Sequence, residues 1–424
     1  MKTVIEALRA NSRVSDYKIN VHRKESYELF FVKGKLETVR RTDVCEKEVT
    51  VYVDHDEFKG DSQFFVYPST TEADLRRLID EAADKALLIN NKHYTLPENE
   101  EGTFEVESNF TDYEVADLAA LIAKTVFEAN TVDGGSLNSV EVFISRHTVT
   151  VLNSRGIHKT QVSYDAMVEA IPTYNGEKQS VELYEQYNFC NLDVEVLRAE
   201  IARKMDEVKA RYEAAAPANA IDCNVILDKQ ELSGLFRRIA GNLNFSSVYS
   251  RSNRFKKGDA IQNDPKGDRI GITMRGAVEG NINSAKFDGD GLALTDRRIV
   301  EDGKAVNYYG SSRFGQYLDE EPTGNLGCTC VDAGTADESV FAKGPYLEVV
   351  SMSGLQVDFF SDYIGGEVRL AYYHDGEKIT PVTALSITGK LSEVLEHIRL
   401  SSEISVFNGY TGPAKALLRH MKIF

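Results

Sequence analysis

The segment ELFFVKGKLETVR (residues 28–40) decides how the first part of the chain folds, because apolar and β-branched residues flank a Lys-Gly-Lys turn. The same alternation extends in both directions, from Tyr17 to Tyr67, and the polar residues 54–57 interrupt it. β-Branched and aromatic residues broken by glycine and aspartate are typical of antiparallel strands. The sequence therefore predicts an antiparallel meander over this stretch.

Two helices are predicted after the meander. The first opens at Ser69, with Glu72 three residues later as in a capping box, and its apolar residues between 75 and 89 keep helical spacing. The second has Thr111 and Glu114 as candidate capping residues, followed by an apolar stripe that ends before a Gly-Gly pair.

A second set of strands is predicted over residues 140–187, and a third helix begins near Asp193. The segment 214–220, rich in alanine and proline, follows this helix. Such a composition is typical of a linker between domains. We therefore predict two domains, residues 1–218 and residues 219–424.

The second half of the chain is predicted to contain more strand than helix. A strand at 223–227 leads into a helix at 229–243, and residues 244–335 are rich in Gly, Asn, Asp and Ser. Strand-like alternation returns between 346 and 388, before a final helix over 391–398. The predicted fold class is α+β, with an N-terminal α/β region of antiparallel strands and helices and a C-terminal domain rich in antiparallel sheet.

Charge and cysteine content restrict the partners and the compartment. The net charge of −17 repels phosphate backbones and anionic lipids, so neither a nucleic-acid nor a membrane partner is expected. The N-terminal residues lack the pattern of a signal peptide, and no apolar run approaches the ~20 residues of a spanning helix. Five cysteines, an odd number spread over a long chain, suit the reduced thiols of a cytosol better than a disulfide framework. A cytoplasmic location is predicted.

Histidine spacing argues against a local zinc motif. Such motifs need two histidines close together on one element, with a glutamate nearby to activate water. No two of the eight histidines lie within nine residues of each other; they are at positions 22, 55, 93, 147, 158, 374, 397 and 420.

Three other groups each allow a functional and a structural interpretation. Cys328 and Cys330 would lie on one face of a strand, as a metal or redox pair or as two small core residues. Residues 288–291 begin like a calcium loop but lack the later ligands, which favours a tight turn. Arg237 and Arg238 suit either a substrate carboxylate or a solvated helix face. A Ser–His–Asp triad stays open, although the chain has no G-x-S-x-G motif.

Several segments, in this order, resemble the TldD/PmbA family of peptidase-pair subunits. They are FVKGKLE (31–37), NSRG (153–156), FDGDG (287–291), HDGEKITPV (374–382) and ITGKL (387–391). The resemblance covers nearly the whole chain. It implies an N-terminal α/β region followed by a sheet-rich region.

The resemblance also implies where a zinc site would lie. In that family one subunit, TldD, holds zinc through His-Glu-x-x-x-His on a helix plus a distant cysteine, whereas its partner, TldE or PmbA, lacks these ligands. On the helix over 235–243, the two histidine positions fall on Arg237 and Asn242, and the glutamate position falls on Arg238. No cysteine follows position 330. Neither a catalytic residue, a metal nor another cofactor is therefore expected, and these three residues are the candidate substrate contacts.

We therefore expect a TldE/PmbA-like, non-catalytic subunit of a metallopeptidase pair that acts on unstructured peptides. Its partner would be a TldD-like zinc-bearing subunit or a second copy in a dimer. Two alternatives remain open: a stand-alone, metal-free hydrolase with a nucleophile such as Cys328, and a non-enzymatic peptide-binding or scaffold protein. The family's older label, modulator of DNA gyrase, receives no physical support from the acidic charge.

Overall fold

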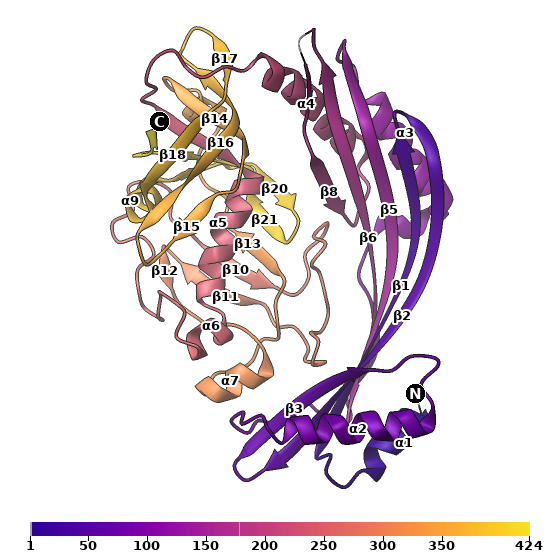
Figure 1. Ribbon diagram of the computed structural model, residues 1–424. Helices are drawn as coiled ribbons and strands as arrows, with labels where there is room; N and C mark the ends of the chain where they lie inside the picture. Colours follow the sequence, from indigo (N-terminus) through magenta and orange to yellow (C-terminus); the bar gives the residue numbers. More distant parts are fainter. Residues whose placement is uncertain (1, 178) are drawn as a thin grey trace.

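The computed structural model describes residues 2–177 and 179–424 and confirms the predicted α+β class. One long, bent antiparallel sheet forms the N-terminal region, and two further sheets form the C-terminal region inside its curve (Figure 1). Among the described residues, no helix is both long and apolar enough to cross a membrane.

The N-terminal sheet has the strand order β3-β2-β1-β5-β6-β4, with β7 and β8 also paired to β6. Its central strands β1, β5 and β6 run for 17, 19 and 18 residues, and alternating residues are buried toward their ends, where the helices pack. The predicted meander is confirmed as the first three strands. The strands are β1 Asp16–Val32, β2 Lys35–His55, β3 Phe58–Phe65, β4 Glu101–Glu105, β5 Gly135–Asn153, β6 His158–Asn175, β7 Ser180–Glu182 and β8 Glu185–Phe189.

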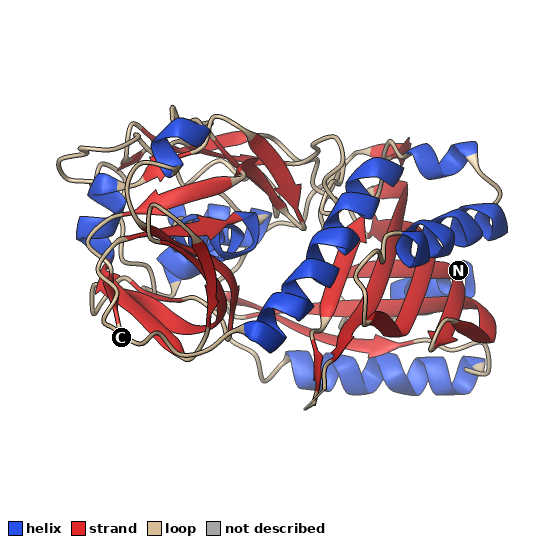
Figure 2. Cartoon of the chain, turned by 90° about the horizontal axis from the view of Figure 1, so that it is seen from above, coloured by secondary structure: helices blue, strands red, loops and turns tan. Residues whose placement is uncertain are grey.

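Four helices cover one face of this sheet and leave the opposite face toward the C-terminal region. Helices α1 (Lys2–Ala10) and α2 (Glu72–Ala86) pack over one end of the sheet, where they share a core with β1 and β2. Helices α3 (Val115–Glu128) and α4 (Val194–Glu213) pack over the other end, where they share a core with β5 and β6. In Figure 2 a long helix, α4, lies along the line where the two regions meet.

Two predicted helix starts are wrong in detail. Helix α2 is capped by Thr71, whose hydroxyl accepts a hydrogen bond from Asp74 N at 3.1 Å, and not by Ser69. The reason is that Ser69 lies inside a turn closed by the bond from Thr70 N to Tyr67 O.

The capping pair predicted for the next helix, Thr111 and Glu114, is also wrong. Thr111 lies in the 3₁₀ turn η1 (Asn109–Asp112), which Ser108 caps. Glu114 occupies the N-cap position of α3, but its side chain makes no capping hydrogen bond. The predicted start of the third helix is confirmed, because Asp193 caps α4.

The turn between β5 and β6 is the predicted Asn153–Gly156 turn, and a buried charge cluster holds it. The Asn153 Oδ1 atom accepts hydrogen bonds from the backbone N–H groups of Arg155 and Ile157. The carboxylate of Asp16 accepts hydrogen bonds from the Ser154 hydroxyl at 2.7 Å and from the Arg155 guanidinium. Lys59, whose side chain is fully buried, lies 2.9 Å from the same carboxylate.

The C-terminal region contains one sheet of order β12-β11-β10-β13-β21-β20 and a second of order β19-β22-β9-β14-β16-β18-β23, with β15 and β17 also paired to β16. Its strands are β9 Asn224–Asp228, β10 Ile272–Arg275, β11 Arg297–Glu301, β12 Lys304–Ala305, β13 Cys328–Val331, β14 Tyr346–Met352, β15 Gln356–Asp358, β16 Tyr363–His374, β17 Ile379–Val382, β18 Leu385–Lys390, β19 Arg399–Leu400, β20 Ile404–Phe407, β21 Tyr410–Pro413, β22 Lys415–Leu418 and β23 Lys422–Ile423. Its helices are α5 Lys229–Asn242, α6 Phe245–Tyr249, α7 Ser312–Leu318, α8 Glu338–Phe341 and α9 Leu391–His397.

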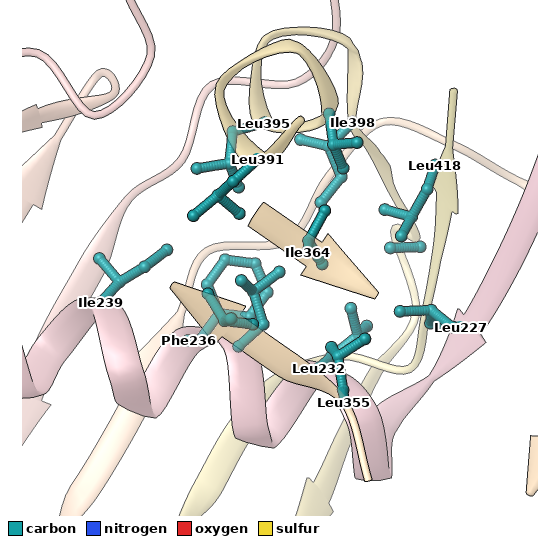
Figure 3. Packing of buried hydrophobic residues seen from close by; sticks show 14 of the residues in the cluster. Leu227, Leu232, Phe236, Ile239, Leu355, Ile364, Leu391, Leu395, Ile398 and Leu418 are labelled. Atoms are coloured by element: carbon teal, nitrogen blue, oxygen red, sulfur yellow. The ribbon is translucent and has the colours of Figure 1, made fainter. Parts of the chain in front are cut away.

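Helix α5 packs in the core that the two C-terminal sheets share. Its residues Leu232, Phe236 and Ile239 lie in one buried cluster with Leu355, which directly precedes β15, and Ile364 of β16 (Figure 3). Residues 244–335, predicted to be loop-rich, also supply four short strands of the first sheet, β10 to β13. Those strands were missed because each is too short to show alternation.

The connection from α4 to β9 contains residues 214–220. Among the described residues, the strands before this connection pair only with one another, as do the strands after it. We propose this connection as the boundary between the predicted domains, 1–218 and 219–424.

Three attachments hold the C-terminal region against the N-terminal sheet. At one end, the Gln316 side chain of α7 both donates to Thr95 O and accepts from Thr95 N. In the middle, Phe287 packs against Val151 on the face of β5 that the helices leave uncovered, and Asp290 forms an ion pair with Lys18 at 2.5 Å. At the other end, Glu200 of α4 forms an ion pair with Lys229, the first residue of α5, at 2.6 Å.

Candidate functional site

Helix α5 carries the predicted site residues, and its sequence explains its position. Asp228 caps the helix by accepting a hydrogen bond from Gln230 N at 2.9 Å. Its apolar residues recur every three or four positions and are all buried: Leu232, Leu235, Phe236, Ile239 and Ala240. This stripe fixes one face of α5 in the core, so Gly234, Arg237 and Arg238 lie on the exposed face.

The outward face of α5 combines two arginines with two glycines. Arg237 and Arg238 are exposed, and within residues 2–177 and 179–424 neither forms a salt bridge. A Cβ atom added at Gly234 or Gly241 would meet nothing within 4 Å, so the space above the helix is open. The face therefore presents two unneutralised guanidinium groups beside bare backbone, in a chain of net charge −17.

Asn242 differs from the two arginines because both ends of its amide are occupied. Its Nδ2 atom donates to Arg238 O at 3.0 Å, and its Oδ1 atom accepts from Arg254 N at 2.7 Å. These bonds tie the last turn of α5 to the following loop. The structure thus brings the three predicted residues onto one helix end and leaves the two arginine side chains free to meet a ligand.

The segment 403–412, where the resemblance places the distant zinc ligand, lies beside this helix. Tyr410 of β21 stacks on Phe236 of α5, with ring centroids 6.2 Å apart. Strand β20 is the outermost strand of its sheet, and its Ile404 and Val406 are exposed. Within the described residues, the buried Ser405 Oγ atom has no hydrogen-bond partner. An open strand edge therefore adjoins the cationic helix.

A cavity of about 150 Å³ lies where β20 and the start of α5 meet the N-terminal region. The Asn188 amide of β8 donates to Asn408 Oδ1 at 3.1 Å, and Lys229 lies 2.6 Å from Glu200 of α4. Burial opposes ionisation of Glu200, but Arg203 and Lys229 outweigh it and lower its pKa to about 2. The wall of the cavity is thus charged and fixed by ion pairs.

The residues at this site do not fit zinc. Arginine stays protonated and has no free lone pair, so neither Arg237 nor Arg238 can coordinate a metal, and their charge would repel one. In the part of the chain that the structure describes, no three His, Cys, Asp or Glu side chains lie close enough to hold a metal ion.

The cysteine pair on β13 consists of protonated, poorly nucleophilic thiols. Cys328 is fully buried and Cys330 is partly exposed. Burial raises the pKa of Cys328 to about 12 and that of Cys330 to about 11. Because the thiolate is the nucleophile, neither residue is an active nucleophile at neutral pH.

Histidine and aspartate side chains elsewhere have structural contacts. His147 on β5 lies 2.8 Å from Asp165 and 3.0 Å from His22. This hydrogen-bonded series therefore ends in a histidine, where a Ser–His–Asp triad would need a serine. The 288–291 segment is a tight turn, in which Asp288 Oδ1 accepts from the N–H groups of Asp290 and Leu292.

Comparison with known proteins agrees with this architecture. Residues 221–424 match the family model described as the PmbA/TldA metallopeptidase C-terminal domain. The chain belongs to the TldD/PmbA family. No curated protein sequence matches it.

Solved structures with the same fold include TldE from Thermococcus kodakarensis, which is 15% identical in sequence and superposes with a TM-score of 0.79. The match spans 100% of the present chain and 99% of the TldE chain. A candidate modulator of a DNA gyrase from Thermotoga maritima MSB8 is 15% identical, with a TM-score of 0.78 and full coverage of both chains. A candidate modulator of DNA gyrase from Bacteroides thetaiotaomicron VPI-5482 is 14% identical, with a TM-score of 0.79. That match spans 100% of the present chain and 97% of the Bacteroides chain.

Sequence reasoning missed the parts of the site that come from outside α5. Strand β20 has only four residues, and Glu200 and Lys229 belong to different regions of the chain. Only the exposed alternation Ile404-Ser405-Val406-Phe407 could have indicated an edge strand.

Proposed function

We propose that this chain is the non-catalytic, TldE/PmbA-like subunit of a metallopeptidase pair and that it binds unstructured peptides beside α5. The observation that carries the proposal is the outward face of α5, where Arg237 and Arg238 stand above bare glycine backbone. This face can attract a peptide carboxylate, but it supplies neither a metal ligand nor a general base.

The neighbouring strand suggests how a peptide would bind. An extended chain can add to an open sheet edge through backbone hydrogen bonds, whereas a folded chain cannot. Strand β20 offers such an edge next to α5. The exposed Ile404 and Val406 would contact apolar side chains of the peptide, and the two arginines would favour an acidic residue or a C-terminus.

Chemistry would then depend on the partner. A TldD-like subunit carrying His-Glu-x-x-x-His would provide the zinc, and this chain would hold the substrate. The stand-alone hydrolase is less well supported, because the buried Cys328 thiol is protonated at neutral pH. The scaffold alternative predicts peptide binding without any peptidase partner.

The test is to mix the purified chain with a zinc-bearing subunit and measure cleavage of an unfolded, acidic peptide. Only the mixture should cleave, and a chelator should stop it. The double variant Arg237→Ala/Arg238→Ala should weaken peptide binding about tenfold, the effect of losing one charge-assisted hydrogen bond.

Arg76 and Arg77 offer a matched control, because they are also adjacent, exposed arginines on a helix, far from α5. Their double alanine variant should bind peptide as the native chain does. Cleavage by the chain alone, unaffected by a chelator, would refute the proposal. Peptide binding with no cleavage in any mixture would favour the scaffold alternative.

A further inference from the structure

The cavity of about 150 Å³ beside the candidate site opens to solvent next to the edge strand β20. Val196 of α4 and Val406 of β20 both line it, and these two residues are 57% and 39% exposed. Figure 1 shows β20 of the C-terminal region facing β8 of the N-terminal sheet, and the hydrogen bond between Asn188 and Asn408 joins the two regions there. The cavity is therefore a gap between the regions that is reached from the β20 edge.

The uncharged part of the cavity wall is mainly apolar and rich in aromatic rings. Tyr187 and Phe189 of β8 and Phe407 of β20 contribute three rings, and the buried Leu192 and Leu197 add aliphatic surface. Aromatic rings attract further aromatic rings in offset or edge-to-face arrangements. A ligand that enters the cavity would meet this surface first.

The charged residues of the wall all have partners already. Glu200 accepts hydrogen bonds from Lys229 and Arg203, both at 2.6 Å, and the other three carboxylates either pair with a lysine or cap a helix. The charged lining residues are Glu185, Asp193, Glu200, Arg203, Asp228 and Lys229. A charged ligand would have to compete with these contacts, so the wall favours an uncharged one.

The volume of the cavity matches one aromatic ring. An engineered cavity of about 150 Å³ lined by Leu, Ile and Phe side chains stays free of water and binds benzene. The cavity between β20 and α4 has about the same volume, 150 Å³, and an apolar wall of similar composition. A single aromatic side chain on an extended peptide fits this space, whereas an added helix or strand does not.

We propose that this cavity is a pocket for one aromatic side chain of a bound peptide. The inference rests on the proposed function, in which an extended peptide adds to the β20 edge beside α5. A peptide that pairs with β20 reaches the cavity at Val406 and Phe407, which belong both to that strand and to the cavity wall. Phenylalanine and tyrosine are the side chains that match the wall and the volume, so this chain would select peptides by their aromatic content.

The length of α5 sets the spacing between the aromatic residue of the peptide and an acidic one. Lys229, at the cavity, and Arg237 are separated by about two turns of this helix, or about 12 Å along its axis. An extended peptide covers this length with about three or four residues. A peptide with a phenylalanine three or four residues from an aspartate should therefore contact both the cavity and the arginines.

Three fluorescently labelled peptides test the preference. They share an unstructured acidic sequence and differ only in carrying phenylalanine, leucine or alanine at that spacing, and fluorescence anisotropy measures the affinity of the purified chain for each. The phenylalanine peptide should bind about tenfold more tightly than the alanine peptide, because its ring is removed from water. Equal affinities for these two peptides would overturn the proposal, and a leucine peptide that binds as tightly as the phenylalanine peptide would overturn the aromatic assignment.

Two valine variants test the location of the pocket. Val196→Trp places a large side chain at the mouth of the cavity and should bring the ratio of the phenylalanine and alanine peptide affinities close to one. Val115→Trp is the matched control, because Val115 is 37% exposed in the first turn of α3 and lines a different groove; this variant should keep the tenfold ratio. Far-UV circular dichroism checks that both variants fold. A folded Val196→Trp variant that keeps the native ratio would contradict the location.

A free aromatic molecule separates failure of the pocket from failure of the proposed function. Saturation-transfer NMR should detect 4-methylphenol bound to the native chain without peptide, and the signal should fall strongly in Val196→Trp. Peptides that bind without any aromatic preference would overturn the pocket and leave the proposed function standing. If no peptide binds, the proposed function fails and the pocket's role in peptide recognition fails with it. Absence of 4-methylphenol binding to the native chain would overturn the pocket whatever the peptides do.

Discussion

Replacing the buried Lys59 with methionine should destabilise the N-terminal region by about 3 kcal/mol. The Lys59 ammonium group is fully buried and lies 2.9 Å from Asp16 and 2.8 Å from Asp54. Methionine has a similar length but leaves Asp16 buried without one of its cations. Removing one partner of a buried pair costs about 3–5 kcal/mol, and the remaining Arg155 guanidinium places this case at the low end of the range.

The loss of stability caused by Lys59→Met should decrease as the pH falls. Burial opposes ionisation of Asp16, but hydrogen bonds from Ser154, Lys59 and Arg155 outweigh it and lower the pKa of the carboxyl group. A lowered pKa stabilises the folded state above the unfolded value of about 3.9, and this stability is lost as the pH falls through the folded value. The difference between the native chain and Lys59→Met should therefore be largest at neutral pH and shrink in acid.

Urea unfolding followed by far-UV circular dichroism at pH 7 and pH 3 measures this difference, since the chain has no tryptophan. Lys124→Met is the matched control, because Lys124 is exposed and its ion pair with Glu128 spans 3.8 Å. The control should change the free energy of unfolding by less than about 0.5 kcal/mol. If Lys59→Met and the control unfold alike at pH 7, the reasoning about the buried cluster is wrong.

Three further predictions concern packing and thiol chemistry. Phe287→Ala should weaken the middle attachment between the regions, at a cost of about 3–5 kcal/mol, and speed limited proteolysis of the connection between them; unchanged proteolysis would contradict this. A thiol reagent should modify the exposed Cys45 in the native protein and reach Cys328 only after unfolding, which peptide mapping by mass spectrometry can follow. Gly60→Ala should lower the melting temperature, because its Cβ would lie 1.8 Å from a backbone carbonyl of α2, whereas Gly234→Ala on the open face of α5 should stabilise the helix by about 0.5–1 kcal/mol.

The strands and helices of the N-terminal region could be predicted because their burial is periodic. The segment 28–40 alternates about its Lys-Gly-Lys turn, and Lys33 and Gly34 both adopt positive φ there. The pairing of β1 with β5 could not be predicted, because it joins residues more than one hundred positions apart and depends on the whole sheet. The start of α2 was predicted at Ser69 because local turn bonds compete with helix capping and are not visible in the pattern.

The candidate site was partly predictable for a similar reason. The apolar spacing of α5 predicted a helix, and that spacing directs Arg237 and Arg238 outward. The neighbourhood of β20 and the cavity wall around Glu200 come from tertiary contacts between distant segments. A single sequence holds no periodic signal for such contacts.

The place of β22 in its sheet has a consequence for synthesis of the protein. Residues 415–418 pair with residues 225–228, so one edge of β9 has no strand to pair with until almost two hundred further residues have been translated. The N-terminal sheet, whose strands end at Phe189, can close long before that point. A nascent or truncated chain would therefore hold a finished first region joined to an incomplete second one, whose unpaired strand is the natural target for a chaperone or for aggregation.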